Sequence, residues 1–231
     1  LLTFVLIAIA IVMFVLVLRI RRERRDLFVL ALVIGLGIPA QGVIGGLSVL
    51  TNLNPYVVGL HFVLSVVLVV LSTVLVYRVY AGPRGARAAV PLWYSALTHA
   101  TSALVAITIL VGIITTGSGP HAGDSGASRN GLDSELLQHV HSWPAYATVA
   151  ATILLLIGAL RLGQPRLARF TGVLLAIEAV QVAVGLAQAR LGLPEILVGA
   201  HMVLACCLAA AMTAVVLSLR EPVASAVDAE K

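Results

Sequence analysis

VVGLHFVLSVVLVVLSTVLVYRVYA, residues 57–81, is the stretch that decides the fold, and it carries no charged residue before Arg78. A helix needs about 20 apolar residues to cross roughly 30 Å of bilayer hydrocarbon, and this stretch is long enough. Closed barrels are the other structures that span a bilayer, but their strands alternate apolar and polar residues, and this stretch does not. It therefore predicts a transmembrane helix.

Six further apolar runs of similar length lie on either side of this stretch. They cover approximately residues 1–19, 27–50, 92–117, 140–162, 168–189 and 195–219. Hydrophobic residues make up 60% of the chain and charged residues 11%, with a mean hydropathy of +1.07. A water-soluble domain of this length does not have such a composition. The sequence predicts an all-α membrane protein with seven transmembrane helices.

The net charge of +5 comes from arginines that gather in alternate loops. They are Arg19, Arg21, Arg22, Arg24 and Arg25, then Arg78, Arg84 and Arg87, then Arg161, Arg166 and Arg169. The positive-inside rule makes these loops cytoplasmic, so residue 1 is expected outside and the C-terminus in the cytoplasm. The chain offers no soluble basic face, which argues against a nucleic-acid partner.

An internal repeat links the two halves of the chain. Subtracting 140 maps four small or polar residues onto others of the same type: Gln181 onto Gln41, Gly185 onto Gly45, Gly199 onto Gly59, and His201 onto His61. The last three predicted helices therefore repeat the first three in the same orientation. The helix at 92–117 has no counterpart, so we expect an eighth helix upstream of Leu1.

The repeat implies a pair of pseudo-symmetric four-helix bundles, of which this chain shows seven helices. Residues 1–81 would supply three helices of the first bundle, and 82–91 a cytoplasmic linker. Residues 92–219 would form the second bundle, and 220–231 a cytoplasmic tail.

Three histidines share one predicted depth, because His61, His141 and His201 all lie near the starts of helices that run in the same direction. Ionisable residues inside a membrane mark functional sites, although a packing role stays open for each. Two facing imidazoles suit a six-coordinate haem in a bundle interior. Zinc is less favoured, since no carboxylate or thiolate completes a tetrahedral shell at this level. Gly59 and Gly199 would let a flat macrocycle approach, or would allow close helix packing.

The other polar residues carry weaker signals. We expect His99 to serve packing or an internal hydrogen bond, His139 to be solvated or to contact a loop, and His121 to be exposed or to reach a bound ligand. Glu178 and Gln181 lie one turn apart and share a face, so the carboxyl group either relays protons or is kept neutral by Gln181.

Cys206 and Cys207 are adjacent on one predicted helix. Their side chains point about 100° apart, which disfavours a disulfide and favours a role as small core residues.

Several motifs carry a family resemblance. The run TGSGPHAGD at 116–124 is followed by His141 at the next helix, QGVIGGL at 41–47 is followed by Asn54-Pro55 and His61, and VGAH stands at 198–201. With these motifs the chain resembles haem A synthase, particularly the actinobacterial type, over essentially its whole length. The run at 116–124 is the most specific of them.

The resemblance implies oxidation of the C8 methyl of haem O to the formyl group of haem A, which terminal oxidases use. It implies eight helices in the bacterial plasma membrane, with His141 and His201 as the axial iron ligands of a bound haem b. His61 would belong to the catalytic site for the substrate haem in the first half. Haem O synthase, membrane lipid and a second copy of the chain are the partners that it suggests.

This sequence departs from the family in two ways. The catalytic Glu and a further ligand would lie upstream of Leu1, so residues 1–231 alone are expected to be inactive. Many relatives carry cysteine pairs in outer loops, and the outer loops of this chain contain none. Two alternatives stay open: a bis-histidine cytochrome b that transfers electrons from quinol, and a haem-free transporter or assembly scaffold.

Overall fold

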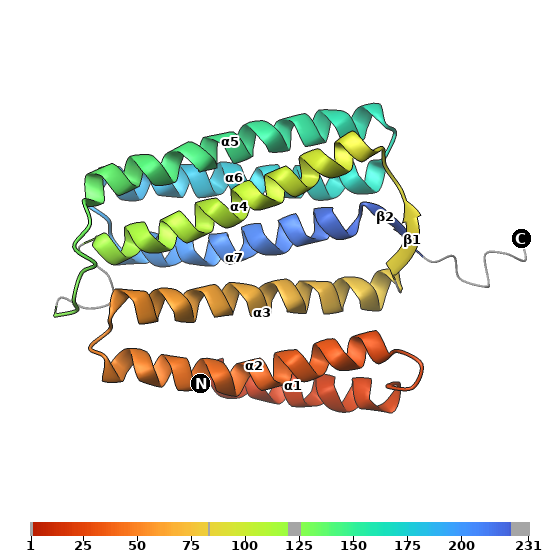
Figure 1. The fold of residues 1–231 in the computed structure, drawn as a ribbon, viewed down its shortest axis with the longest axis horizontal. Helices are drawn as coiled ribbons and strands as arrows, with labels where there is room; N and C mark the ends of the chain where they lie inside the picture. The colour runs from red at the N-terminus through yellow and green to blue at the C-terminus, as the bar shows by residue number, and fades with distance from the viewer. Residues whose placement is uncertain (1, 83, 120–125, 223–231) are drawn as a thin grey trace, which may run out of the picture.

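The computed structural model describes residues 2–82, 84–119 and 126–222, and these contain seven helices (Figure 1). The helices are α1 Leu2–Arg19, α2 Arg25–Leu50, α3 Pro55–Ala81, α4 Leu92–Ser118, α5 Ser134–Arg161, α6 Pro165–Arg190 and α7 Glu195–Leu217. The six from α2 to α7 are long and apolar enough to cross a membrane. The prediction of an all-α, multi-pass membrane protein is confirmed.

The predicted helix boundaries agree with the structure to within three residues, except at the start of α5. This helix begins at Ser134 rather than at 140, because the Asp133 side chain accepts hydrogen bonds from the backbone N–H groups of Glu135 and Leu136. A side chain that caps the first turn in this way stabilises a helix start. His141 therefore lies two turns inside α5 rather than at its opening.

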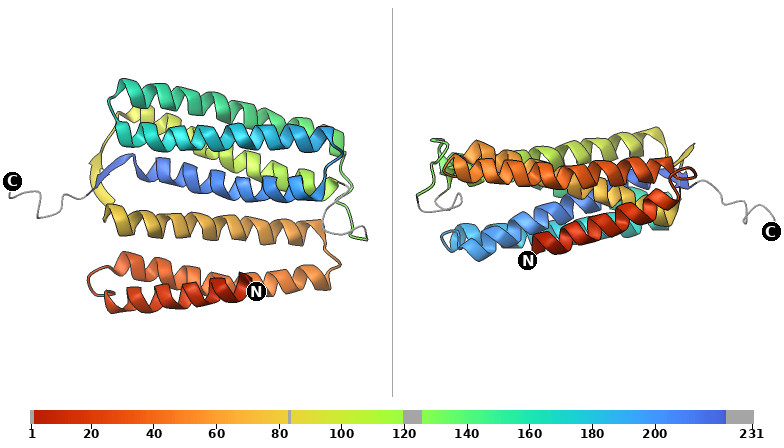
Figure 2. Two further views of the ribbon diagram at one scale, coloured as in Figure 1. Left: turned by 180° about the vertical axis from the view of Figure 1, so that it is seen from behind. Right: turned by 90° about the horizontal axis from the view of Figure 1, so that it is seen from below.

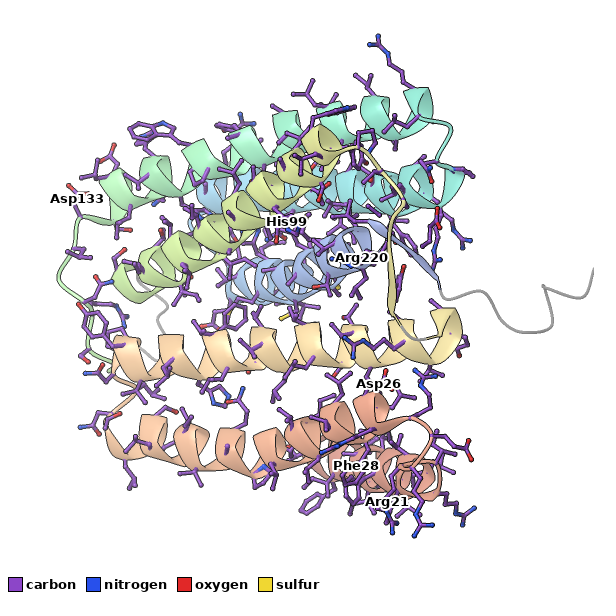
Figure 3. All side chains as sticks on the ribbon, turned by 45° about the vertical axis from the view of Figure 1, so that its right-hand side comes forward. Arg21, Asp26, Phe28, His99, Asp133 and Arg220 are labelled. Atoms are coloured by element: carbon purple, nitrogen blue, oxygen red, sulfur yellow. The ribbon has the colours of Figure 1, made fainter. Side chains whose placement is uncertain are left out.

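Helices α4 to α7 form a closed four-helix arrangement, in which each packs against the next and α4 packs against α7. Helix α3 packs against both α4 and α7, and α2 and then α1 lie beyond it (Figures 1 and 2). The helices run alternately up and down. One end of the molecule therefore holds most of the arginines, among them Arg21 and Arg220, and the other holds the Asp133 cap (Figure 3). We call these the arginine-rich end and the cavity end.

A two-stranded sheet at the arginine-rich end was not predicted. Strand β1, Arg84–Ala88, pairs antiparallel with β2, Arg220–Pro222, just after α7. The expected linker at 82–91 is thus tied to the first residues of the expected tail, and residues 223–231 lie outside the described part of the chain. The strands are too short and too polar to show a strand pattern in the sequence.

The four-helix arrangement is solidly packed only toward its arginine-rich end. Tyr94, Leu155, Leu167 and Val215 are at most 1% exposed and belong to one apolar cluster. All four lie on the turns of α4 to α7 nearest that end. The same helices enclose a cavity at their other end, so the packed core serves as its base.

Tyr94 ties α4 to α5 within this core, where its hydroxyl group donates to the backbone carbonyl of Leu155 at 3.1 Å. We expect Tyr94→Phe to lower the free energy of unfolding by about 0.5–1.5 kcal/mol, the net contribution of one hydrogen bond. Unfolding in detergent micelles would measure the loss. Tyr80→Phe, at a side chain that is 88% exposed, is the control and should be nearly neutral. Equal effects of the two substitutions would contradict the prediction.

Candidate functional site

The repeat found in the sequence is present in the side-chain contacts of the two helical hairpins α2–α3 and α6–α7. Gln41 Nε2 donates to the backbone carbonyl of His61 at 3.1 Å, and Gln181 Nε2 donates to that of His201 at the same distance. Each glutamine thus holds its own helix in a fixed register against the next helix, at the level of the histidine. The pairing of Gln41 with Gln181 and of His61 with His201 is confirmed.

The turns between these helices repeat as well. Asn52 and Leu53 have φ angles of 51° and 55°, and the equivalent Gly192 and Leu193 have 73° and 59°. Two consecutive residues in this left-handed region are uncommon outside glycine, so their recurrence indicates a shared turn. The turns close with equivalent hydrogen bonds, from Leu53 N to Ser48 O at 2.8 Å and from Leu193 N to Gln188 O at 2.7 Å.

The three predicted site histidines lie at one level, as expected. His61 is the seventh residue of α3, His141 the eighth of α5 and His201 the seventh of α7, and all three helices start at the cavity end. The ring centroids of His141 and His201 are 6.2 Å apart, and their planes meet at 72°. His61 stands apart from this pair, on α3 and against α2. The structure therefore brings two of the three histidines together.

A glycine lies against each of these imidazoles. A Cβ atom added at Gly112 would lie 2.8 Å from His141 Cε1, and one at Gly185 would lie 3.2 Å from His201 Cε1. Gly45 stands in the same relation to His61, at 3.3 Å. Real Cβ contacts are rarely this close, so the absence of a side chain lets each ring lie against the neighbouring helix.

These are not the glycines that the sequence suggested. A Cβ at Gly59 would meet the side chain of Ile113 on α4 at 2.7 Å, so Gly59 serves the close packing of α3 on α4. Gly199 has no atom within 4 Å of its added Cβ. Gly45 and Gly185 were noticed only as members of the repeat, and Gly112 was missed.

His141 and His201 both line a cavity of about 440 Å³ at the cavity end, which residues of α3, α4, α5, α6 and α7 line together. Pockets for small molecules and cofactors have volumes of about 300–1,000 Å³, so this one is of ordinary size for a ligand. Its wall on α6 includes Glu178, Gln181 and Gly185, which recur every three or four residues and so lie on one helix face.

Several buried polar atoms around the cavity have no hydrogen-bond partner among the described residues. They are the Nδ1 atoms of His141 and His201, the Oε1 atoms of Gln181 and Gln188, and Oε2 of Glu178. Leaving a buried polar atom unpaired costs about 1–3 kcal/mol, which native proteins rarely accept without cause. The unpaired atoms indicate that the cavity takes a ligand with polar groups.

The separation of the two histidine rings suits a metal atom held between them. Such an arrangement places ring centroids roughly 6 Å apart, since a metal–imidazole bond is about 2 Å and the nitrogen lies about 1 Å from its ring centroid. The measured separation is 6.2 Å. The described residues contain no group of three or more His, Cys, Asp or Glu that could hold a metal ion by themselves. A haem needs only two such ligands, because its macrocycle supplies the other four.

Glu178 is only 3% exposed. Its Oε1 accepts a hydrogen bond from the Thr152 hydroxyl group at 2.8 Å. The prediction that Glu178 and Gln181 share an inward face is confirmed, since both line the cavity. Gln181 is not a hydrogen-bond partner of Glu178, since its Nε2 donates to the carbonyl of His201 and its Oε1 has no partner among the described residues. Thr152, on α5, was not singled out in the sequence.

His99 and His139 do not line the cavity. His139 is exposed, as predicted, whereas His99 is exposed on α4 rather than packed, so that prediction is wrong. His121 lies outside the described residues, as does most of the loop motif that contains it.

Cys206 and Cys207 are both free, in agreement with the expected absence of a disulfide between them. Cys206 is half-buried, but Cys207 is exposed and is not a core residue.

A membrane helix bundle with two facing histidines in an internal cavity is the class of protein that this fold and site define. The chain belongs to the COX15-CtaA family of cytochrome oxidase assembly proteins, which matches residues 1–213. No curated protein and no solved structure matches the chain. The family relation confirms the resemblance seen in the sequence and assigns a role in cytochrome oxidase assembly.

Proposed function

We propose that this protein is a haem A synthase, which oxidises the C8 methyl group of haem O to the formyl group of haem A. The observation that carries the proposal is the His141–His201 pair, 6.2 Å apart in a cavity of a cytochrome oxidase assembly protein. The conversion removes four electrons from the methyl carbon and adds one oxygen atom. It therefore needs redox chemistry that the side chains lining this cavity do not have.

In this proposal His141 and His201 would hold a haem b. When bound, the haem supplies one-electron transfer. Gln181 keeps α6 and α7 in register at His201, while Gly112 and Gly185 let both imidazoles lie back against α4 and α6. The protein thus positions both rings before the cofactor arrives, and preorganised ligands lose less freedom on binding.

His61 is proposed to act at the substrate site of the first half. Its surroundings repeat those of His201, with Gln41 on its backbone carbonyl and Gly45 against its ring. Gln41 Nε2 also lies 2.7 Å from the Ser65 hydroxyl, which the second half replaces with Ala205. The surroundings of His61 thus combine the same glutamine and glycine with a different polar group. This combination fits the binding of a related macrocycle in a different role.

Haem extraction from cells tests the proposed reaction. Deleting the gene should deplete haem A and let haem O accumulate, and the wild-type gene should reverse both changes. A gene carrying His61→Ala should fail to restore haem A, although the purified variant should keep its haem b. Normal haem A in the deletion strain would refute the proposal.

A bis-histidine cytochrome b that only transfers electrons is the second candidate, because the same histidine pair and cavity would serve it. It predicts haem b in the purified protein but normal haem A in the deletion strain. A haem-free transporter or scaffold predicts purified protein without Soret absorption under haem-replete expression.

A further inference from the structure

Glu178 lies where the packed core of α4 to α7 ends and the cavity begins. Leu174, one turn closer to the arginine-rich end, is fully buried in the core, whereas Glu178 and Gln181 line the cavity. Gln181, one helical turn from Glu178, bonds the backbone of His201, whereas Thr152, which bonds the Glu178 carboxyl group, lies about three turns from His141 on α5. The carboxyl group therefore lies deeper in the cavity than the histidine pair.

Few groups are placed to stabilise a negative charge on the Glu178 carboxyl group. Thr152 donates one hydrogen bond to Oε1, and Oε2 has no partner among the described residues. The ion pairs of Asp26 with Arg24 and Arg78 lie near the arginine-rich end, far from Glu178 along the bundle. A buried carboxylate without a cation costs several kcal/mol.

The titratable groups that face Glu178 across the cavity are His141 and Tyr146 on α5 and His201 on α7. The remaining titratable or charged side chains on these two helices do not line the cavity. They are Glu135, His139 and Arg161 on α5, and Glu195, Cys206 and Cys207 on α7. No arginine or lysine therefore faces the carboxyl group from either helix.

The bound haem of the proposed function, on which this inference rests, would be the missing counter-charge. A ferric haem core carries one net positive charge, whereas a ferrous core carries none. Reduction thus removes the charge that stabilises a carboxylate in a poorly solvated cavity, where charge interactions are strong. The carboxylate is then left uncompensated, and a proton from solvent neutralises it.

We propose that Glu178 is a redox-linked proton-binding group of the haem b site. One electron from a one-electron reductant converts ferric to ferrous iron, and one proton from solvent binds the Glu178 carboxylate. Oxidation of the iron releases that proton. Thr152 occupies Oε1, so Oε2 is the oxygen free to take the proton.

Redox titration of the purified haem protein at several pH values tests this assignment. The wild-type midpoint potential should fall as pH rises, by up to about 59 mV per pH unit, which is a tenfold change in proton activity for one electron. Glu178→Gln can still accept the Thr152 hydrogen bond but cannot bind the proton. Its slope should be less than half that of the wild type.

Glu195→Gln is the matched control, because Glu195 is exposed at the start of α7 and does not line the cavity. It should keep the wild-type slope, including any part that comes from the carboxylates of the haem itself. A wild-type slope in Glu178→Gln overturns the inference.

A second measurement covers the case in which Glu178→Gln does not fold. The reduced-minus-oxidised infrared difference spectrum of the wild type should gain a protonated carboxyl band that shifts in heavy water. Absence of this band overturns the inference. Wild-type protein without a Soret band refutes the proposed function together with the inference, whereas a Soret band with an unchanged slope refutes the inference alone.

Discussion

Replacing His201 with alanine is expected to weaken haem binding to the purified protein by more than about 100-fold, because loss of even an outer-shell partner costs about 10–100-fold in metal affinity. His201 would be one of the two residues that hold the haem. Its Nδ1 atom is buried without a protein partner among the described residues, and its ring lies 6.2 Å from that of His141. Haem content per protein and the low-spin spectrum measure the loss. His141→Ala should behave alike.

His139→Ala and His99→Ala are the matched controls for this result. Both residues are exposed and lie outside the cavity lining, and His139 is only two residues from His141 on the same helix. Both variants should keep wild-type haem content and spectrum. Unchanged haem loading in His141→Ala and His201→Ala would instead remove the basis for a haem site in this cavity.

Gly112→Ala, on α4, is expected to disturb the His141–His201 site. The new Cβ would lie 2.8 Å from His141 Cε1 and 3.2 Å from its Nδ1, so the imidazole must move. Overpacking costs about 1–3 kcal/mol, which corresponds to roughly 5- to 150-fold weaker haem binding if the strain falls on the bound state. Haem titration of the purified apoprotein, with the position of the Soret band, measures both affinity and ligand geometry.

Gly172→Ala on α6 is the control for a glycine within a helix, since no atom lies within 4 Å of its added Cβ. It should leave haem affinity unchanged and, if anything, stabilise its helix slightly. Equal haem affinity in Gly112→Ala and the wild type would mean that His141 does not depend on its close approach to α4.

The sequence predicted the helices and the level of the site because both depend on local properties. In a bilayer each helix satisfies its own backbone hydrogen bonds, so apolar length alone marks a spanning segment. Depth then follows from position along the helix, which put His61, His141 and His201 at one level before any contact was known. The repeat was equally visible, because Gln41 and Gln181 are rare polar residues in apolar runs.

Among the described helices, the start of α5 is the one boundary that local hydropathy did not predict. Hydropathy placed it at 140, among the first apolar residues, but the Asp133 side chain starts the helix six residues earlier. This signal was present in the sequence, as an Asp ahead of a helix-forming segment, and a search for capping residues would have found it.

The partners of each site residue depended instead on how the helices pack. Gly112 and His141 are on different helices, so no helical period joins them, and their contact exists because α4 packs against α5. Thr152 and Glu178 meet for the same reason across α5 and α6. His99 was expected to pack inside, but the rotation of α4 places it on the exposed surface.

The length of each helix, the depth of its polar residues and the internal repeat thus follow from the sequence. The bilayer imposes length and depth on every spanning segment separately. The neighbours of a helix and its rotation about its own axis are set by close packing between side chains that are distant in the sequence. For this reason the histidine level was predictable, whereas the glycines behind the imidazoles, the Thr152–Glu178 hydrogen bond and the pairing of β1 with β2 were visible only in the folded chain.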